Sequence, residues 1–378
     1  MEAKVAAAVK PPAPIGALAG LRVIEFAGLG PGPFASMLLA DMGAEVVTVM
    51  RQEQKPSSTG ALMRGRRQVV ANLKDPTTVG KVRDLVDRAD VLVEGYRPGV
   101  MERLGFAPEE LMRRNKRLIY ARMTGWGQFG PLAHSAGHDI NYIAITGALH
   151  AIGGGNRPVP PLNLVGDYGG GALYLVVGIL AALFERQRSG RGQIIDAAMC
   201  DGAASLMSAF FDLFHAGHWK DDRQSNLVDG GAHFYGVYEC ADGKFISVGA
   251  IEPQFYAQLR KLAGLGGEDF DAQMDQASWP TLREEVAAVF RTKSRDEWTA
   301  IMAGSDACVA PVLSLTEAPD HPHMIERSTF ILQDGVLQPA PAPRFSRTAS
   351  VARRSIDGTL EDLAQEWSDH AIPMVTHL

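Results

Sequence analysis

Hydrophobic residues in the first half of the chain form short continuous runs that alternate with stretches of helical periodicity. Residues 21–26 and 44–49 are typical of buried strands, and a turn rich in Gly and Pro leads from the first of them into a helix at 34–42. The same alternation continues with strands expected at 68–73, 91–94, 117–123 and 193–197 and helices at 77–88, 169–188 and 201–216. Strands that alternate with helices predict an α/β fold around a parallel sheet.

A different pattern begins after residue 231. Two alternating strands, 236–240 and 244–248, flank the turn Ala241-Asp242-Gly243, and helices are expected near 252–263 and 282–292. These elements predict a small α+β domain. The expected divisions of the chain are a flexible N-terminal extension at 1–17, the first part of a large domain at 18–216, a linker at 217–231, the small domain at 232–330 and a return segment to the large domain at 331–378.

Composition and charge exclude several classes of partner. The chain has 378 residues, of which 46% are hydrophobic and 21% charged, as in globular proteins with a large core. Its formal net charge of -6 argues against general binding to nucleic acid or anionic membranes. The longest apolar run, 172–184, is too short to cross a bilayer, so no membrane partner is expected. Cys200, Cys240 and Cys308 are widely spaced, which favours a reducing, cytoplasmic location.

The turn that carries Gly28, Gly30 and Gly32 resembles a dinucleotide-binding loop only superficially. Pro33 occupies the place of the last glycine, and two prolines remove N–H donors that a pyrophosphate would need. Arg51, at the end of the next strand, stands where an acid would bind a plain ribose; an arginine there suits a ribose that bears a phosphate. A plain nicotinamide site is therefore not favoured.

Basic residues gather beyond Arg51 although the chain is acidic overall. The members of this group are Lys55, Arg64, Arg66, Arg67 and Lys74. Such a run is often only a solvated loop. Parallel α/β sheets bind anionic ligands at the carboxyl ends of their strands, however, so we interpret the cluster as a phosphate site.

Two acid–base side chains, His138 and Asp167, lie in polar, turn-forming surroundings, and each precedes an apolar segment of helical pattern. Each also has a simpler interpretation, the first as a structural histidine and the second as a helix N-cap. His321 and His323 could suggest a metal site, but no other ligands accompany them, and no metal is expected.

Five motifs in a fixed order carry a more specific signal. They are Glu94-Gly95-Tyr96-Arg97-Pro98-Gly99, Gly125-Trp126-Gly127-Gln128, Gly137-His138-Asp139-Ile140-Asn141-Tyr142, Pro161-Leu162-Asn163-Leu164-Val165-Gly166-Asp167 and Ala250-Ile251-Glu252-Pro253-Gln254-Phe255-Tyr256. Together they resemble the family III CoA-transferase superfamily, and within it the α-methylacyl-CoA racemases. The resemblance extends from about residue 18 to about residue 348, which is nearly the whole chain.

The resemblance implies a Rossmann-like large domain built from both chain ends, a small α+β domain in the middle, and an interlocked homodimer. It also implies an acyl-CoA substrate, with CoA on the large domain and no cofactor beyond that CoA moiety. Carried over by position, the CoA contacts would be Arg51, Ala71, Asn72, Lys74, Arg97 and Arg103.

Inverting a carbon beside a thioester carbonyl requires removal of a proton from one face and return of a proton to the other. By resemblance, His138 and Asp167 hold these roles; a histidine pKa of about 6.5 suits this task, whereas an aspartate pKa of about 3.9 would need to be raised. Glu252 would orient His138, and Asp139 would lie near Asp167. The first N–H groups of the helix after Asp167 would stabilise the enolate, and Gly169–Gly171 would let the thioester approach the backbone.

The expected activity is the interconversion of (R)- and (S)-2-methylacyl-CoA thioesters, an isomerase reaction of lipid and fatty-acid metabolism. Two alternatives stay open. In a CoA transferase of the same superfamily, the residue that matches Asp167 attacks the acyl thioester as a nucleophile, and such enzymes generally lack a histidine at the position of His138. A non-catalytic CoA-thioester binding protein would tolerate the loss of both side chains.

Overall fold

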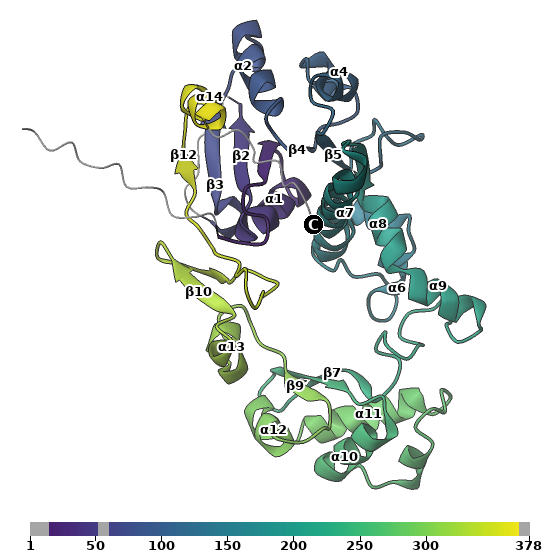
Figure 1. The fold of residues 1–378 in the computed structure, drawn as a ribbon. Helices are drawn as coiled ribbons and strands as arrows, with labels where there is room; N and C mark the ends of the chain where they lie inside the picture. The colour runs from purple at the N-terminus through teal and green to yellow at the C-terminus, as the bar shows by residue number, and fades with distance from the viewer. Residues whose placement is uncertain (1–14, 52–59, 370–378) are drawn as a thin grey trace, which may run out of the picture. The chain divides into compact units, whose positions relative to one another are not determined.

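The computed structural model of this chain describes residues 15–51 and 60–369 (Figure 1). They form two compact units. The first unit contains the chain up to Ala136, Gly166–Gly202 and the segment from Phe330 onward, and the second contains Gly137–Val165 and Ala203–Thr329. Most of the predicted extension 1–17, and Lys55 of the predicted phosphate cluster, lie outside the described residues.

A seven-stranded parallel sheet forms the centre of the first unit. Its strands are β1 (Arg22–Phe26), β2 (Glu45–Met50), β3 (Arg66–Val70), β4 (Val91–Glu94), β5 (Ile119–Thr124), β6 (Ile194–Ala198) and β12 (Ile356–Asp357). Every residue of β1, β4 and β5 is buried, as continuous apolar runs in a parallel sheet require. The prediction of an α/β fold with a parallel sheet is confirmed.

The order of the strands determines where loops meet. Across the sheet the order is β12-β3-β2-β1-β4-β5-β6, and every neighbouring pair is parallel. The chain builds from β1 outward to β3 and then returns to the other side of β1 with β4. Such a reversal opens a crevice between the loops that follow the two strands, and open α/β sheets bind ligands there.

Prolines and capping side chains near their first residues begin the helices α1 and α2 of the first unit. Pro31 opens α1, where its missing N–H costs nothing. Asp75 caps α2 by accepting hydrogen bonds from the N–H groups of Thr77 at 3.3 Å and Thr78 at 3.0 Å. Trp367, near the end of the described chain, is buried in the same apolar cluster as the strands. The principal helices are α1 (Pro31–Asp41), α2 (Pro76–Val86), α3 (Val100–Arg103), α4 (Pro108–Arg114), α7 (Tyr174–Ser189) and α14 (Leu360–Asp369).

Arg64 attaches the return segment to the first unit. The segment begins with the hairpin of β10 (Phe330–Gln333) and β11 (Val336–Pro339). The Arg64 guanidinium donates to both carboxylate oxygens of Asp41, at 2.9 and 2.6 Å, and to Gln338 Oε1 at 3.1 Å. Because Arg64 and Asp41 are both buried, this fork fixes the hairpin against the end of α1.

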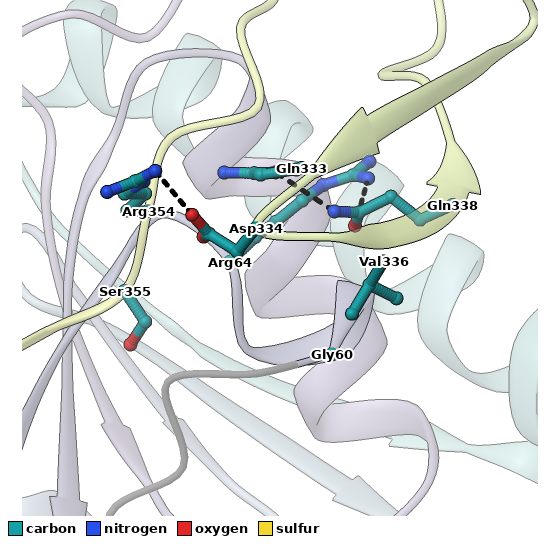
Figure 2. Close-up of a pocket in the computed structure, with 8 residues that line it drawn as sticks. All are labelled: Gly60, Arg64, Gln333, Asp334, Val336, Gln338, Arg354 and Ser355. Atoms are coloured by element: carbon teal, nitrogen blue, oxygen red, sulfur yellow. Dashed lines mark hydrogen bonds and ion pairs between the residues drawn. The ribbon is translucent and has the colours of Figure 1, made fainter.

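A small pocket lies beside this contact (Figure 2). Arg354, on its rim, pairs with Asp334 at 2.5 Å, while Arg64 is engaged by Asp41. Both cations are therefore neutralised by carboxylates, and the pocket does not have the charge of an anion site. Its lining residues are Gly60, Arg64, Gln333, Asp334, Val336, Gln338, Arg354 and Ser355.

The second unit contains a three-stranded antiparallel sheet with its own apolar core. Phe234, Phe290 and Trp298 are buried there, and Ser294 begins α12 with a capping box to Glu297. The elements are α5 (Asp139–Ala144), α6 (Ala148–Ala151), α9 (Ser208–His215), β7 (Tyr235–Glu239), β8 (Phe245–Gly249), α10 (Pro253–Ala263), α11 (Trp279–Phe290), α12 (Arg295–Met302) and β9 (Val309–Pro311).

The structure differs from the predicted elements in the central part of the chain. The single helix expected at 201–216 is two helices, α8 (Met199–Leu206) and α9, which are separated at Met207. The stretch 137–165, expected in the large domain, belongs to the second unit. The reason is packing: Ile143 and Ala148 form a buried cluster with Ala203.

The helix expected at 169–188 begins earlier, because the π-helix η2 (Leu164–Leu173) continues directly into α7. The combined helix Leu164–Ser189 is long and apolar enough, by length and composition, to cross a membrane. Helices that pack in a protein core reach the same values, and α7 packs against β5 and β6. One side of α7 is therefore packed against the sheet of the first unit.

Burial of His233 predicts a specific pH dependence of stability. Its ring is fully buried, with Nε2 2.7 Å from the Tyr256 hydroxyl, and burial lowers the pKa of His233 to about 4. The folded chain therefore holds this ring neutral, whereas the unfolded chain protonates it near pH 6.5. Stability from this residue is complete above about pH 6.5 and falls as the pH decreases toward 4, by about 3 kcal/mol in all.

Chemical denaturation between pH 4.5 and 7.5 tests this expectation. The His233→Gln variant should lose the histidine part of the pH dependence, whatever its absolute stability. His218→Gln, which removes an exposed histidine from the same unit, is the matched control. Parallel pH curves for His233→Gln and the unsubstituted protein would contradict the assignment.

Candidate active site

Loops at one edge of the first unit carry the residues that are predicted from the sequence to bind a ligand. The strands are parallel, so the loops after β1, β2, β3 and β4 all emerge at the same edge of the sheet. They include both sides of the crevice between β1 and β4. An extended anionic ligand can therefore contact several of these loops at once.

Tyr96 joins three of the loops. It follows β4, and its hydroxyl donates to the carbonyl of Ala27, after β1, at 3.3 Å. The guanidinium of Arg51, after β2, lies 5.2 Å from the centre of the Tyr96 ring. Arg51 is exposed, and its guanidinium lies over an aromatic ring.

The loop after β3 presents two polar groups to solvent. Ala71 is buried and donates its N–H to the Met50 carbonyl at 2.8 Å, which continues the sheet past the end of β3. Asn72 and Lys74 are exposed, and the Asn72 side chain accepts from the Lys74 N–H at 3.1 Å. This bond fixes the turn that carries the Lys74 ammonium.

Arg97 and Arg103 are exposed on the segment after β4. Gly99 separates them with a φ of +81°, a conformation that L side chains rarely adopt. A Cβ at Gly99 would lie 3.3 Å from Arg103 Nη1, so the guanidinium folds back over this turn. The six predicted CoA contacts thus lie on three loops of one edge; their contact with CoA remains a prediction.

Other members of the predicted phosphate cluster do not reach that edge. Arg64 is 5% exposed and paired with Asp41, and Arg66 is 1% exposed and paired with Glu25 at 2.6 Å. Arg67 pairs with Glu366 at 2.7 Å. The interpretation of Arg64 and Arg66 as phosphate ligands is therefore wrong, because both are buried and paired, whereas for Arg67 it stays a prediction. Their charges stabilise internal contacts of the first unit, which a count of basic residues does not reveal.

Asp167 lies at the same edge, beside the turn between β1 and α1. A Cβ at Gly30 would lie only 2.9 Å from Asp167 Oδ2, and Gly30 has a φ of +64°. The Tyr168 ring packs at 4.7 Å from the Phe34 ring of α1. The Asp167 carboxylate therefore lies next to the N-terminal end of α1, on the β1 side of the crevice.

The position of Asp167 within its helix corrects two expectations. Asp167 is the fourth residue of the π-helix η2 and does not precede the helix as an N-cap. In a π-helix each N–H bonds the carbonyl five residues earlier, so the N–H groups from Gly169 onward are engaged within the helix. They are not available to an enolate. The N–H groups of the first turn, around Asp167, do not have partners within the helix.

The glycines after Asp167 serve packing. A Cβ at Gly171 would lie 2.9 Å from Met199 Cγ and 3.0 Å from the Gly166 carbonyl. A Cβ at Gly202, in α8, would lie 1.8 Å from the Gly170 carbonyl. The expectation that Gly169–Gly171 admit a thioester is therefore wrong for Gly171, because protein atoms occupy that space.

His138 stands at the N-cap position of α5, in the second unit. Its N–H donates to Asn141 Oδ1 at 3.0 Å, and its carbonyl accepts from the N–H groups of Asn141 and Tyr142. The residue is exposed, whereas the neighbouring Asp139 is 7% exposed. The backbone of His138 is thus fixed while its side chain is accessible. Asp167 belongs to the first unit, so the pairing of His138 and Asp139 with Asp167 stays a prediction.

Glu252 occupies the N-cap position of α10, also in the second unit, and is exposed. Its carbonyl accepts from the N–H groups of Phe255 and Tyr256, at 3.0 and 2.9 Å. Within residues 15–51 and 60–369, no hydrogen bond or ion pair joins Glu252 to His138. Over the described residues, one copy of the chain therefore does not form the predicted contact between Glu252 and His138.

The cysteines do not provide a nucleophile. Burial raises the pKa of Cys200 to about 11, and burial also raises the pKa of Cys240 and of Cys308. The Glu252 carboxylate adds to the shift at Cys308. Each side chain is therefore a neutral thiol at physiological pH.

Within the described part of the chain, no three His, Cys, Asp or Glu side chains are grouped to hold a metal ion. His321 Nδ1 accepts from the His323 N–H at 3.2 Å at the start of α13 (Pro322–Glu326). This contact gives the His321–His323 pair a local role as a helix cap.

Comparison with known proteins adds evidence that the geometry alone does not provide. A family model described as CoA-transferase family III matches residues 18–356. The α-methylacyl-CoA racemase of Mus musculus is 51% identical over 338 residues, 88% of each chain. That of Homo sapiens is 46% identical and covers 89% of this chain and 88% of its own. A crystal structure of a CAIB/BAIF family protein from Brucella suis superimposes with a TM-score of 0.79 at 25% identity, covering 94% and 99% of the two chains.

The contact between Gly202 and Gly170 predicts that a single methyl group displaces the helix of Asp167. Because the obstructing atom is a backbone carbonyl, Gly202→Ala should destabilise the chain by about 1–3 kcal/mol, the usual range for overpacking. Gly80→Ala is the matched control, since Gly80 also lies within a helix but no atom lies within 4 Å of the place that its Cβ would take. This control should be neutral or stabilise by up to about 1 kcal/mol. Equal thermal unfolding midpoints for the two variants would refute the packing argument.

Proposed function

This chain belongs to CoA-transferase family III, and we propose that it is an α-methylacyl-CoA racemase that interconverts (R)- and (S)-2-methylacyl-CoA thioesters. The observation that carries the proposal is the identity of 46–51% to racemases over most of the chain. The family resemblance predicted from the sequence motifs is confirmed. The position of Asp167 beside the crevice between β1 and β4 supports a reaction at that edge of the sheet.

In the proposed reaction, one of His138 and Asp167 removes the α-proton of the thioester and the other returns a proton to the opposite face. The electron pair of the broken C–H bond moves into an enolate. Asp139 is proposed to lie near Asp167 and to share its proton, and Glu252 to orient the His138 ring. Because the Glu252–His138 contact is not formed within one described chain, a second copy of the chain is the proposed source of Glu252.

Two helix ends can stabilise the enolate oxygen. Asp167 lies in the first turn of η2 and beside Gly30, the residue before α1. The positive ends of both helices are therefore close to its carboxylate. Gly32 is the only one of the first three residues of α1 that has an N–H, because Pro31 and Pro33 have none. In this proposal the N–H groups at the starts of η2 and α1 stabilise the enolate, in place of the N–H groups after Asp167 that were predicted from the sequence.

CoA is proposed to bind along the edge formed by the loops after β2, β3 and β4. Arg51 and Lys74 offer cationic donors to phosphate groups, as do Arg97 and Arg103. Ala71 and Asn72 would line the adenosine side. All these residues belong to the same unit as Asp167. A metal has no step in this chemistry.

A homodimer is also proposed, as the racemase family implies. Four apolar side chains on and before α9 are exposed and could be covered by a second copy: Leu206 is 45%, Phe211 49%, Leu213 38% and Phe214 50% exposed. Light scattering after size exclusion should give twice the chain mass, and Phe211→Asp should lower it. A monomeric unsubstituted protein would contradict this part of the proposal.

The racemase reaction is tested by NMR of separate epimers of a 2-methylacyl-CoA in deuterated water. Each epimer should exchange its α-hydrogen and yield the other epimer, with no carboxylate acceptor present. His138→Ala and Asp167→Ala should each slow epimerisation by about 10²–10⁴-fold, the usual contribution of a positioned acid or base. His134→Ala, an exposed histidine of the first unit, serves as the control.

Exchange of labelled CoA and binding of CoA, measured beside α-hydrogen exchange, separate the alternatives. A transferase would exchange labelled CoA only with a carboxylate acceptor and would leave the α-hydrogen in place. A CoA-thioester binding protein would bind CoA without either reaction. If no 2-methylacyl-CoA incorporates deuterium, the racemase proposal fails.

A further inference from the structure

A buried ion-pair network contacts both ends of the segment 95–103, which carries Arg97 and Arg103. Glu94, the last residue of β4, and Arg122 of β5 are paired across the sheet and are 1% and 7% exposed. Arg122 Nε donates to Glu94 Oε1 at 2.8 Å, and Arg122 Nη1 donates to Glu102 Oε1 at 3.0 Å. One guanidinium therefore holds two carboxylates that lie at opposite ends of the 95–103 segment.

The network also engages the backbone of this segment. Glu94 Oε2, the second oxygen of the carboxylate, accepts from the Tyr96 N–H at 2.8 Å. Tyr96 in turn contacts Arg51 and Ala27, so its position affects the loops after β1 and β2. At the other end, Glu102 immediately precedes Arg103 in α3. Both ends of the segment are thus held by charge-assisted hydrogen bonds, which are stronger than neutral ones.

We propose that Arg122, acting through Glu94 and Glu102, is a positioning residue that sets the 95–103 segment to bind the nucleotide part of CoA. This inference rests on the proposed function, because it takes Arg97 and Arg103 as phosphate contacts. Arg122 does not touch the reacting carbon. Its effect is on affinity for the phosphate-bearing end of the substrate and not on proton transfer.

Glu102 gives the sharper test, because its side chain is 36% exposed and its truncation leaves the buried Arg122 still paired with Glu94. Removal of Arg122 instead would leave Glu94 buried without its cation and threaten the fold. Glu102→Ala should raise the Kd of CoA, measured by calorimetry, by about tenfold, the loss of one good charged hydrogen bond. Glu102→Gln, which keeps an oxygen acceptor for Arg122, should recover part of this loss.

A second readout separates positioning from general damage. Glu102→Ala should raise KM for 2-methylacyl-CoA with kcat changed by less than about twofold, as expected when uniform binding is lost. With a 2-methylacyl-pantetheine, which has no nucleotide, the kcat/KM of Glu102→Ala should fall no further than that of the control variant. Glu361→Ala is that control, since it breaks an exposed ion pair of the same unit, with Lys81 at 2.6 Å.

The possible results are distinguishable. If the unsubstituted protein binds CoA and Glu102→Ala binds it equally well, the positioning role is wrong while the proposed function stands. Equal losses with the CoA and pantetheine substrates would also overturn the positioning role. If the unsubstituted protein neither binds CoA nor exchanges the α-hydrogen, the proposed function fails and this inference fails with it.

Discussion

The close contact of two backbones determines where Asp167 lies. Helix η2 can approach α8 only because Gly202 has no side chain at the Gly170 carbonyl, and it approaches the turn before α1 only because Gly30 has none at the Asp167 carboxylate. A carboxylate held by backbone packing has little freedom to move. The π-helical form of η2 is part of the same arrangement, since π-turns occur frequently at functional sites.

The parallel sheet supplies the second constraint. Because the strands are parallel, the turn beside Asp167 and the loops after β2, β3 and β4 emerge at one edge, and the reversal of strand order at β1 opens a crevice there. The cationic groups of Arg51, Lys74, Arg97 and Arg103 are therefore on the same unit as the carboxylate, without any contribution from the second unit. In the proposed function, the first unit binds CoA and carries Asp167, and the second unit contributes His138 and Glu252.

The sequence predicted the strands well because apolar runs in a fully buried sheet are continuous, as in β1, β4 and β5. It also placed Arg51 and Lys74 after parallel strands, where the structure has them, whereas it failed where tertiary packing decides. Arg64 and Arg66 look like surface cations but are buried against Asp41 and Glu25. The helix expected from residue 169 begins at Leu164, and 137–165 joins the second unit through contacts that lie far apart in sequence.

The central claim is that His138 and Asp167 face opposite sides of one carbon. A crystal structure of the protein with a bound 2-methylacyl-CoA tests it most directly. A His138 ring nitrogen and an Asp167 carboxylate oxygen should lie on opposite faces of the α-carbon, each within about 3.5 Å, the separation of groups poised to react. Both groups on the same face of the α-carbon, or a His138 ring well beyond that reach, would show that the two residues do not act as opposite-face acid and base.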